Sequence, residues 1–212
     1  MKLPALYAIA NIDDLRDPLA YVKELLLAGA EIIQLRAKTT SARELSTLCQ
    51  AILSEVRSQG TSTKIIINDL LELCQEIGAD GVHLGQEDDS VARARTLLGP
   101  EAIIGYSTHT RKQVEAAPQA LLSYLAFGPV FNSPTKQGHA AVTGIEILQA
   151  LRPLVKIPLV AIGGITRENA PAVFEGGVDS VAVISDLRTE EDKGQIVRAY
   201  EEIRARARRR GT

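Results

Sequence analysis

Short apolar runs recur along the chain, separated by longer stretches with the periodicity of helices. The runs span residues 6–10, 31–35, 64–68, 81–84, 102–106, 124–127, 159–162 and 181–184. Continuous apolar runs of this kind predict strands buried on both faces, as in a parallel sheet that is covered by helices. The pattern therefore indicates repeated βα units.

Helix boundary residues support this division. Pro18 stands near the start of one periodic stretch and Gly29 near its end, and another stretch closes on Gly176 and Gly177. Proline at the start and glycine at the end are typical helix signals. Segments 25–33, 74–82 and 174–181 repeat one order, in which a helix, a glycine, an acidic residue and the next strand follow each other. We interpret them as equivalent αβ turns.

The eight predicted strands in 212 residues favour an α/β fold of the (β/α)8 TIM barrel class, with residues 1–212 forming a single domain. An open, doubly wound sheet is the alternative. Because active sites of barrels lie at the carboxyl ends of the strands, chemically capable residues should follow the strands. Polar and charged residues do follow strands two to eight, and the opposite turns carry few such groups. This asymmetry favours the barrel.

Composition narrows the classes of function. The chain is 45% hydrophobic and has a net charge of -2, so it has no general attraction to nucleic acid or to anionic membranes. The basic stretch at about 204–212 is interpreted as a solvated helix end or tail. Cys49 and Cys74 match neither a disulfide framework nor a zinc site. With no apolar stretch of about 20 residues, a cytoplasmic protein is expected.

Three cationic residues are predicted to reach the barrel mouth. Side chains alternate along a strand, so Gln34, Arg36 and Lys38 should project together as the second strand leaves the core. Lys136 would join them from the loop after the sixth strand. Cations from separate loops are typical of a receptor for a multiply charged phosphate. The alternative is a strand end that carries solvated charge.

Two carboxylates follow neighbouring strands. Asp69 and Asp88 would lie close to the cations, and Mg²⁺ prefers a few carboxylates together with phosphate oxygens. The alternatives are helix N-caps or surface acids. Beyond strands seven and eight, Gly164 and Ser185 indicate a second phosphate site, because phosphate in barrels often binds at these loops. The alternative is a plain turn. Two phosphorylated ligands indicate group transfer.

The ordered motifs resemble those of the thiamine phosphate synthase family over nearly the whole chain. They are QLRAK (34–38), IINDLLELCQEIGADGVHLGQEDD (66–89), IGYSTHT (104–110), GPVFNSPTK (128–136), VAIGGIT (160–166) and VAVIS (181–185). The resemblance implies a TIM barrel that joins hydroxymethylpyrimidine pyrophosphate to hydroxyethylthiazole phosphate with Mg²⁺, giving thiamine phosphate and pyrophosphate.

The resemblance also implies roles for individual residues. The pyrimidine pyrophosphate is expected to contact Gln34, Arg36, Lys38, Asn68, Ser107 and Lys136. Of these, the catalytic residues are expected to be Arg36, Lys38, Lys136 and Ser107. The thiazole phosphate and the product are expected at Ser133, Thr135, Gly164, Ile184 and Ser185. The metal is expected at Asp69 and Asp88.

Some positions depart from the pattern of the family. Ala10–Asn11 stands where a Thr-Asp pair is common, which leaves the fit of that pocket wall open. Ala37 replaces a usual Glu, and Asn132–Ser133 replaces a usual Pro-Thr. None of these changes affects a charged residue that is expected to bind the substrates or the metal.

Alternatives and open points remain at this stage. The related thiazole tautomerase lacks the metal segment that contains Asp88, and a non-catalytic sensor of phosphorylated ligands should lack Asp69, Asp88 or Lys136. His83 could face the pyrimidine or be a satisfied barrel histidine, His109 is expected to be a loop or cap residue, and His139 lies in the 128–143 loop. Whether that loop closes, whether the thiazole carries a carboxylate and whether the chain forms a homo-oligomer stay open.

Overall fold

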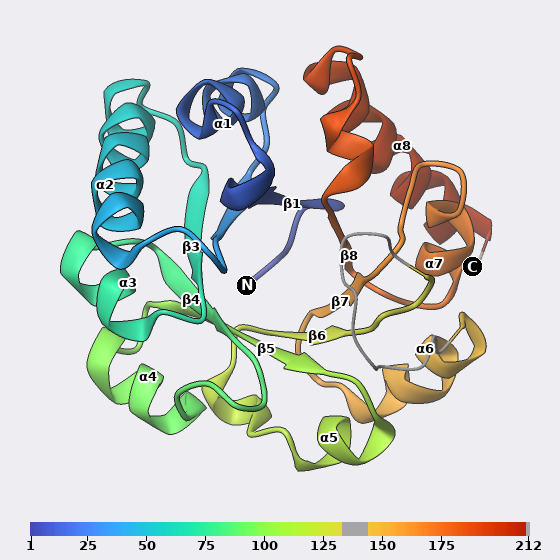
Figure 1. The fold of residues 1–212 in the computed structure, drawn as a ribbon. Helices are drawn as coiled ribbons and strands as arrows, with labels where there is room; N and C mark the ends of the chain where they lie inside the picture. The colour runs from blue at the N-terminus through green and yellow to red at the C-terminus, as the bar shows by residue number, and fades with distance from the viewer. Residues whose placement is uncertain (133–143, 211–212) are drawn as a thin grey trace.

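The computed structural model describes residues 1–132 and 144–210. Parallel strands form a closed barrel in chain order, and β8 pairs with β1 (Figure 1). The strands are β1 (Leu6–Asn11), β2 (Ile32–Arg36), β3 (Lys64–Asn68), β4 (Gly81–Leu84), β5 (Ile103–Thr108), β6 (Tyr124–Phe127), β7 (Leu159–Ile162) and β8 (Ser180–Val183). The TIM barrel prediction is confirmed, and the open sheet is excluded.

The helices surround the barrel as an outer ring (Figure 1). They are α1 (Pro18–Leu27), α2 (Ala42–Ser58), α3 (Leu71–Ile77), α4 (Val91–Leu98), α5 (Arg111–Ala116), α6 (Glu146–Leu151), α7 (Ala170–Glu175) and α8 (Lys193–Arg210). Short 3-10 helices are η1 (Ile12–Asp14), η2 (Gln119–Leu121), η3 (Arg152–Leu154) and η4 (Ser185–Arg188). Pro18 begins α1 as predicted, and the Asp17 carboxylate caps it by accepting the amide of Ala20 at 3.0 Å.

Strand boundaries shift slightly from the predicted ones. The fifth strand continues to Thr108, because its polar end still pairs with β6 in the register Thr108↔Phe127. The eighth begins at Ser180, which pairs with Val160 of β7. In both cases backbone pairing extends the strand through residues that the apolar pattern left out.

Two apolar cores divide the molecule. The inner one fills the barrel with Leu3, Tyr7, Ile9, Ile32, Ile66, Ile103, Tyr124, Ala126, Val160 and Ala182. The larger outer one packs the helices against the opposite faces of the strands. Leu3 precedes β1, and its carbonyl accepts a hydrogen bond from Arg204 of α8 at 2.8 Å. Leu3 thus places part of this core at the amino-terminal end of the barrel, and active sites in this fold lie at the carboxyl ends of the strands.

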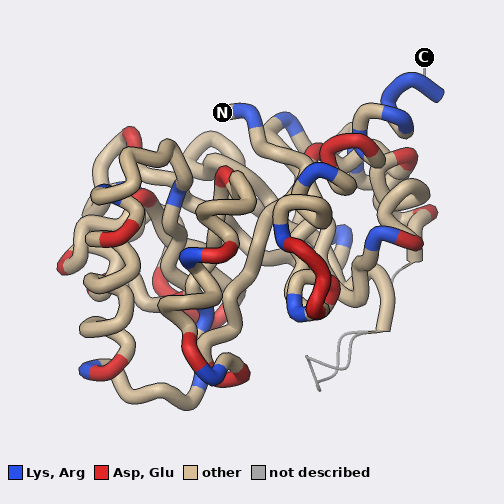
Figure 2. The backbone as a smooth tube through the Cα atoms, turned by 90° about the horizontal axis from the view of Figure 1, so that it is seen from above, with Lys and Arg blue, Asp and Glu red and all other residues tan. Residues whose placement is uncertain are grey.

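The αβ turns form as predicted. Gly29, Gly78 and Gly177 adopt positive φ angles of 80°, 64° and 90°, which glycine tolerates better than any other residue. Cys49 and Cys74 are buried and free. Acidic and basic residues intermingle over the surface, and the end of α8 is basic (Figure 2). Across residues 1–132 and 144–210, every helix is too short or too polar to cross a membrane.

Candidate active site

A cavity of about 680 Å³ opens at the carboxyl ends of the strands. Every predicted ligand-contacting residue in the described part of the chain lines it. These residues are Gln34, Arg36, Lys38, Asn68, Asp69, Asp88, Ser107, Gly164, Ile184 and Ser185. The predictions for Ser133, Thr135, Lys136 and His139 fall outside the described residues. The predicted residues come from six of the eight strands or the loops that follow them, and the structure places them around one cavity.

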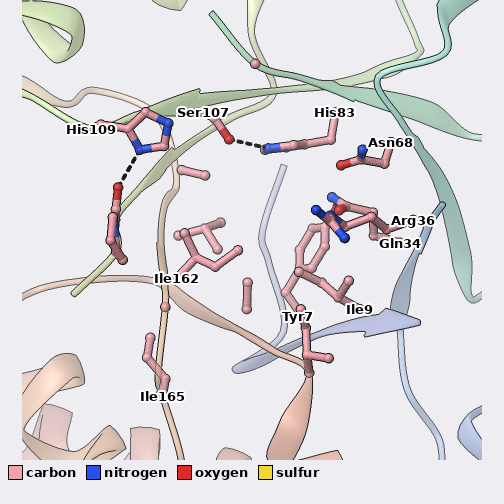
Figure 3. A pocket seen from close by; sticks show the side chains of 18 of the residues that line it. Tyr7, Ile9, Gln34, Arg36, Asn68, His83, Ser107, His109, Ile162 and Ile165 are labelled. Carbon is pink, nitrogen blue, oxygen red and sulfur yellow. Dashed lines mark hydrogen bonds between the residues drawn. The ribbon is translucent and has the colours of Figure 1, made fainter. Parts of the chain in front are cut away.

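The alternating residues of β2 share the cavity, as the strand geometry requires. Gln34 is buried at 3% exposure, Arg36 is half-buried and Lys38 is exposed at the rim. Figure 3 shows Gln34 and Arg36 near Asn68, across the cavity from Ile162 and Ile165. The series therefore runs from an uncharged floor to a cationic mouth.

Asn11 fixes the direction of Arg36. The Asn11 Oδ1 atom accepts a hydrogen bond from Arg36 Nη1 at 2.6 Å, and Asn11 Nδ2 donates to Asp14 Oδ2 at 2.6 Å. Asp14 in turn forms an ion pair with Arg188 at 3.0 Å. Ala10 packs in the outer core. The unusual Ala10–Asn11 pair thus supplies a neutral amide that orients the guanidinium.

Asp13 anchors the loop that carries Lys38, a role that the sequence interpretation missed. Its carboxylate accepts the backbone amide of Lys38 at 2.6 Å, the amide of Thr40 at 3.0 Å and the Thr40 hydroxyl at 2.7 Å. Burial opposes ionisation of Asp13, but these hydrogen bonds outweigh it and lower the pKa of the carboxyl group. Asp13 therefore remains an ionised anchor at neutral pH.

Asp69 holds a left-handed backbone conformation, with φ 64°, that is rare for a residue with a side chain. Its amide donates to the carbonyl of His83 at 2.8 Å, which links β3 to β4. The carboxylate forms an ion pair with Lys38. Asp69 does not cap α3, since the N-cap residue is Leu70. Sparsely populated backbone conformations cluster at functional sites, so the N-cap alternative is replaced by a carboxylate directed at the cavity.

Asp88 is not a helix cap either. The cap of α4 is Ser90, whose hydroxyl accepts the amide of Arg93 at 3.1 Å. The Asp88 carboxylate instead accepts the amide of Gly85 at 2.6 Å. Partial burial and the neighbouring carboxyl group of Asp69 raise the pKa of Asp88 above its usual value. The two acids are therefore close enough to repel each other when both are ionised.

Asp69 and Asp88 fit a hard cation such as Mg²⁺. Both offer oxygen donors, and their mutual repulsion would be relieved by a bound cation. In the described part of the chain, no cluster of three or more His, Cys, Asp or Glu residues forms a complete metal cage. A pair of carboxylates that leaves the other positions open matches the usual Mg²⁺ site, which is completed by water and substrate phosphate.

The cavity floor is polar and buried. His83 Nδ1 lies 2.9 Å from the Tyr124 hydroxyl and His83 Nε2 lies 2.7 Å from Ser107 Oγ (Figure 3). Tyr7 and Tyr124 hydroxyls are 2.7 Å apart, and Gln34 Nε2 donates to Tyr7 at 3.1 Å. His83 is thus a satisfied barrel histidine that also lines the cavity, and its contact with the pyrimidine stays a prediction. Both tyrosines lie within apolar runs that predicted buried strands, and the contact between their hydroxyl groups was not predicted.

His109 lies in the loop after β5, as expected, and it also lines the cavity. Its Nδ1 atom lies 2.5 Å from the carbonyl of Gly128, so Nδ1 carries the proton and donates to that oxygen (Figure 3). His109 therefore ties the end of β5 to the residue that follows β6. The STHT motif places His109 directly after the fifth strand, and this was the sequence signal that could have predicted its place in the cavity.

Gly163 and Gly164 allow the loop after β7 to pack against the loop after β6. The amide of Phe131 donates to the carbonyl of Gly163 at 3.1 Å. A Cβ atom on Gly164 would lie 2.3 Å from the carbonyl oxygen of Asn132, and one on Gly163 would lie 2.6 Å from Pro129 Cα. The glycines are needed for this contact between loops, which the sequence interpretation did not include among their roles.

Alanine at Gly164 is expected to destabilise the fold by more than alanine at Gly60. The two glycines have nearly the same φ, 61° and 62°, but Gly60 has no atom within 4 Å of an added Cβ. Gly60→Ala therefore measures the conformational cost alone, about 1–2 kcal/mol, and Gly164→Ala adds the collision. Urea unfolding of both variants measures the difference. Equal losses would show that the loop after β6 moves aside freely.

The loops after β7 and β8 are linked by charge. Arg167 forms ion pairs with Asp186 at 3.0 Å and with Glu191 at 2.7 Å. The Tyr200 hydroxyl donates to Asp186 at 2.8 Å from α8. These contacts hold the two loops that carry Gly164 and Ser185 in one arrangement at the cavity rim.

Known proteins share this fold and sequence. A family model described as thiamine monophosphate synthase matches residues 6–187. A thiamine-phosphate synthase of Koribacter versatilis is 41% identical over 193 residues, covering 88% of this chain and 90% of the relative. One of Syntrophomonas wolfei is 42% identical over 172 residues and covers 81% of each chain. The structure of thiamine phosphate pyrophosphorylase from Pyrococcus furiosus superposes with a TM-score of 0.81 at 32% identity, covering 95% of this chain and 96% of that one.

The family model covers nearly the whole barrel, from the start of β1 to the loop after β8, and the relatives span most of their own lengths. The matched region contains every described residue that lines the cavity. The chain belongs to the thiamine monophosphate synthase family.

Proposed function

We propose that the chain is a thiamine-phosphate synthase that joins hydroxymethylpyrimidine pyrophosphate to hydroxyethylthiazole phosphate and releases pyrophosphate. The main support is the division of the cavity rim. Arg36, Lys38, Asp69 and Asp88 lie on one part of it, and the loops with Gly164 and Ser185 lie on another. One rim region has the charges for a metal-bound pyrophosphate, and the other has a glycine and a hydroxyl for a single phosphate.

Mg²⁺ would be held by Asp69 and Asp88, with pyrophosphate oxygens completing its shell. When bound, it would neutralise charge on the leaving group and act as a Lewis acid. Lys38 forms an ion pair with Asp69. The residue that would bind phosphate is therefore in contact with a residue that would bind the metal. The Asp69–Lys38 pair can then separate to serve the metal and the pyrophosphate.

Group transfer exchanges one bond for another. The bond between the pyrimidine methylene carbon and the pyrophosphate oxygen breaks, and its electron pair leaves with pyrophosphate. The lone pair of the thiazole nitrogen then forms the new bond to the methylene carbon. Negative charge on the leaving group rises along this path, and Arg36 and Lys38 offset it from fixed positions. Asn11 and Asp13 hold these two residues in place.

Alanine at Ser185 is expected to weaken use of the thiazole phosphate selectively. Loss of one hydroxyl contact to a charged phosphate should raise the KM for this substrate about tenfold, because a hydrogen bond to a charged group contributes roughly 1.5–3 kcal/mol. The KM for the pyrimidine pyrophosphate should change little. Ser54→Ala, on an exposed position of α2, is the control. Equal weakening for both substrates would argue against separate phosphate sites.

An omission experiment tests the proposed function. Pyrophosphate release is measured with the wild-type chain, both phosphorylated substrates and Mg²⁺, and then with each component left out in turn. We expect sustained release only in the complete mixture. Release that does not depend on the thiazole phosphate would indicate hydrolysis instead of transfer, and conversion of a thiazole alone would indicate a tautomerase.

A further inference from the structure

Five side chains form a continuous row of hydrogen bonds across the cavity floor. The order is Gln34, Tyr7, Tyr124, His83 and Ser107, with neighbouring polar atoms 3.1, 2.7, 2.9 and 2.7 Å apart. They come from β2, β1, β6, β4 and β5, so the row crosses the barrel. Gln34 and Ser107, at its two ends, are the members expected to contact substrate. The residues between these two ends have not yet been given a role.

Hydrogen counting gives the row a direction. Gln34 Nε2 donates to the Tyr7 oxygen, so the Tyr7 hydroxyl hydrogen needs another acceptor. Within the described residues, Tyr124 is the remaining hydrogen-bond partner of that hydroxyl. Tyr124 then donates to His83 Nδ1. In a neutral imidazole the other nitrogen carries the proton, so His83 Nε2 donates to Ser107 Oγ. With Gln34 Nε2 as the donor to Tyr7, reversing the Tyr7–Tyr124 link or the Tyr124–His83 link would leave a buried hydroxyl hydrogen without an acceptor among the described residues.

We infer that Tyr7 and Tyr124 are positioning residues that fix the donor and acceptor pattern of the substrate site. Because Ser107 Oγ accepts from His83, its own hydrogen is directed to a ligand acceptor. Because Gln34 uses its amide nitrogen on Tyr7, its carbonyl oxygen is left to accept from a ligand. The row thus presents an acceptor on the β2 side of the floor and a donor on the β5 side.

The barrel is built around this row. Tyr7 and Tyr124 are each only 1% exposed, and burial raises the pKa of both phenols, so they remain neutral donors. Gly105 of β5 makes room for Tyr124, since a Cβ atom there would lie 2.1 Å from Tyr124 Cζ and 2.2 Å from its hydroxyl oxygen.

The pattern selects a chemical class of ligand. It fits a flat heteroaromatic ring whose amino group donates to Gln34 and whose ring nitrogen accepts from Ser107. This inference rests on the proposed function, in which the first substrate is an aminopyrimidine. An oxo group in place of the amino group would set two acceptors against each other at Gln34. The site should therefore reject the oxo analogue, as sites built around hydrogen bonds do.

The tautomer of His83 can be measured without any change to the row. Nitrogen NMR of the wild-type chain, labelled in its three histidines, distinguishes a proton on Nε2 from one on Nδ1 or on both. Spectra of His109→Gln and His139→Gln variants assign the His83 signals by elimination. We expect the Nε2-protonated neutral ring. A ring protonated on Nδ1, or on both nitrogens, would overturn the inference.

Tyr124→Phe tests the consequence for the ligand. Calorimetry measures the dissociation constants of the aminopyrimidine pyrophosphate and its oxo analogue with Mg²⁺. The wild-type chain should prefer the amino form at least 100-fold, and Tyr124→Phe should reduce this preference roughly tenfold while His83 loses its single tautomer. The control is Tyr106→Phe, which changes a phenol on β5 outside the cavity lining. It should behave as the wild type.

An unchanged amino preference in folded Tyr124→Phe would overturn the inference, as would a loss of the same size in Tyr106→Phe. The melting temperature shows whether Tyr124→Phe is folded. If it is not folded, the tautomer of His83 in the wild-type chain decides whether the inference holds. Failure of the proposed function is a separate result. In that case the wild-type chain binds neither pyrimidine pyrophosphate, whereas the His83 spectrum still reports on the row itself.

Discussion

Arg36→Ala is expected to slow turnover by roughly 10²–10³-fold, the usual cost of losing one preorganised contact to a developing charge. The loss should fall on the rate more than on substrate binding, because the negative charge of the leaving pyrophosphate increases toward the transition state. Asn11 holds Arg36 at 2.6 Å, so the guanidinium is already oriented before substrate binds. Single-turnover kinetics at saturating substrate measure this effect without interference from product release.

The control for Arg36 is Arg43, an exposed residue near the start of α2 and outside the cavity lining. Arg43→Ala removes the same charge from the chain and should leave the rate nearly normal. The double variant of Arg36 and Lys38 should lose less than the product of the single losses, because both residues act on one anion. A rate loss in Arg43→Ala as large as that in Arg36→Ala would reject the site-specific explanation.

Asp88→Asn should raise the Mg²⁺ concentration needed for half-maximal turnover by roughly 10- to 100-fold, the range found when a metal site loses a supporting partner. Asparagine keeps an oxygen that can accept the Gly85 amide, so the loop after β4 should retain its shape. Stability should therefore change little. Titration of turnover with Mg²⁺ and thermal unfolding of the same sample measure the two effects.

Asp89 provides a matched control beside Asp88. It pairs with Arg93 on the surface at 2.5 Å and does not line the cavity. Asp89→Asn removes an equal charge one residue away, and a surface pair of this kind contributes at most about 1 kcal/mol. Its Mg²⁺ dependence should match that of the wild type. If Asp88→Asn also keeps the wild-type dependence, Asp88 is not a metal ligand.

Much of the barrel could be predicted from periodicity alone. The third, fourth, sixth and seventh strands have the predicted bounds, because their apolar runs end at turn residues. The alternation of Gln34, Arg36 and Lys38 also placed these side chains on one face, and the barrel prediction placed that face at the cavity. Such predictions need only local geometry, since a strand fixes which residues share a face.

The contacts that orient the site could not be predicted in this way. Tyr7 and Tyr124 meet across 117 positions of sequence, and each alone looks like an ordinary apolar core residue. The contact of Asn11 with Arg36 depends on the register of β1 against β2. The packing requirement at Gly164 arises from the neighbouring loop. Spatial partners of this kind follow from closure of the barrel, and no spacing along the chain encodes them.

The most direct measurement is a balance of both products in one reaction. The wild-type chain is incubated with Mg²⁺, hydroxymethylpyrimidine pyrophosphate and hydroxyethylthiazole phosphate, and samples are analysed for thiamine phosphate and pyrophosphate over time. Our account predicts that the two products appear together in equal amounts, and that Arg36→Ala slows both without changing their ratio. Pyrophosphate without thiamine phosphate, or no reaction of the wild-type chain, would contradict it.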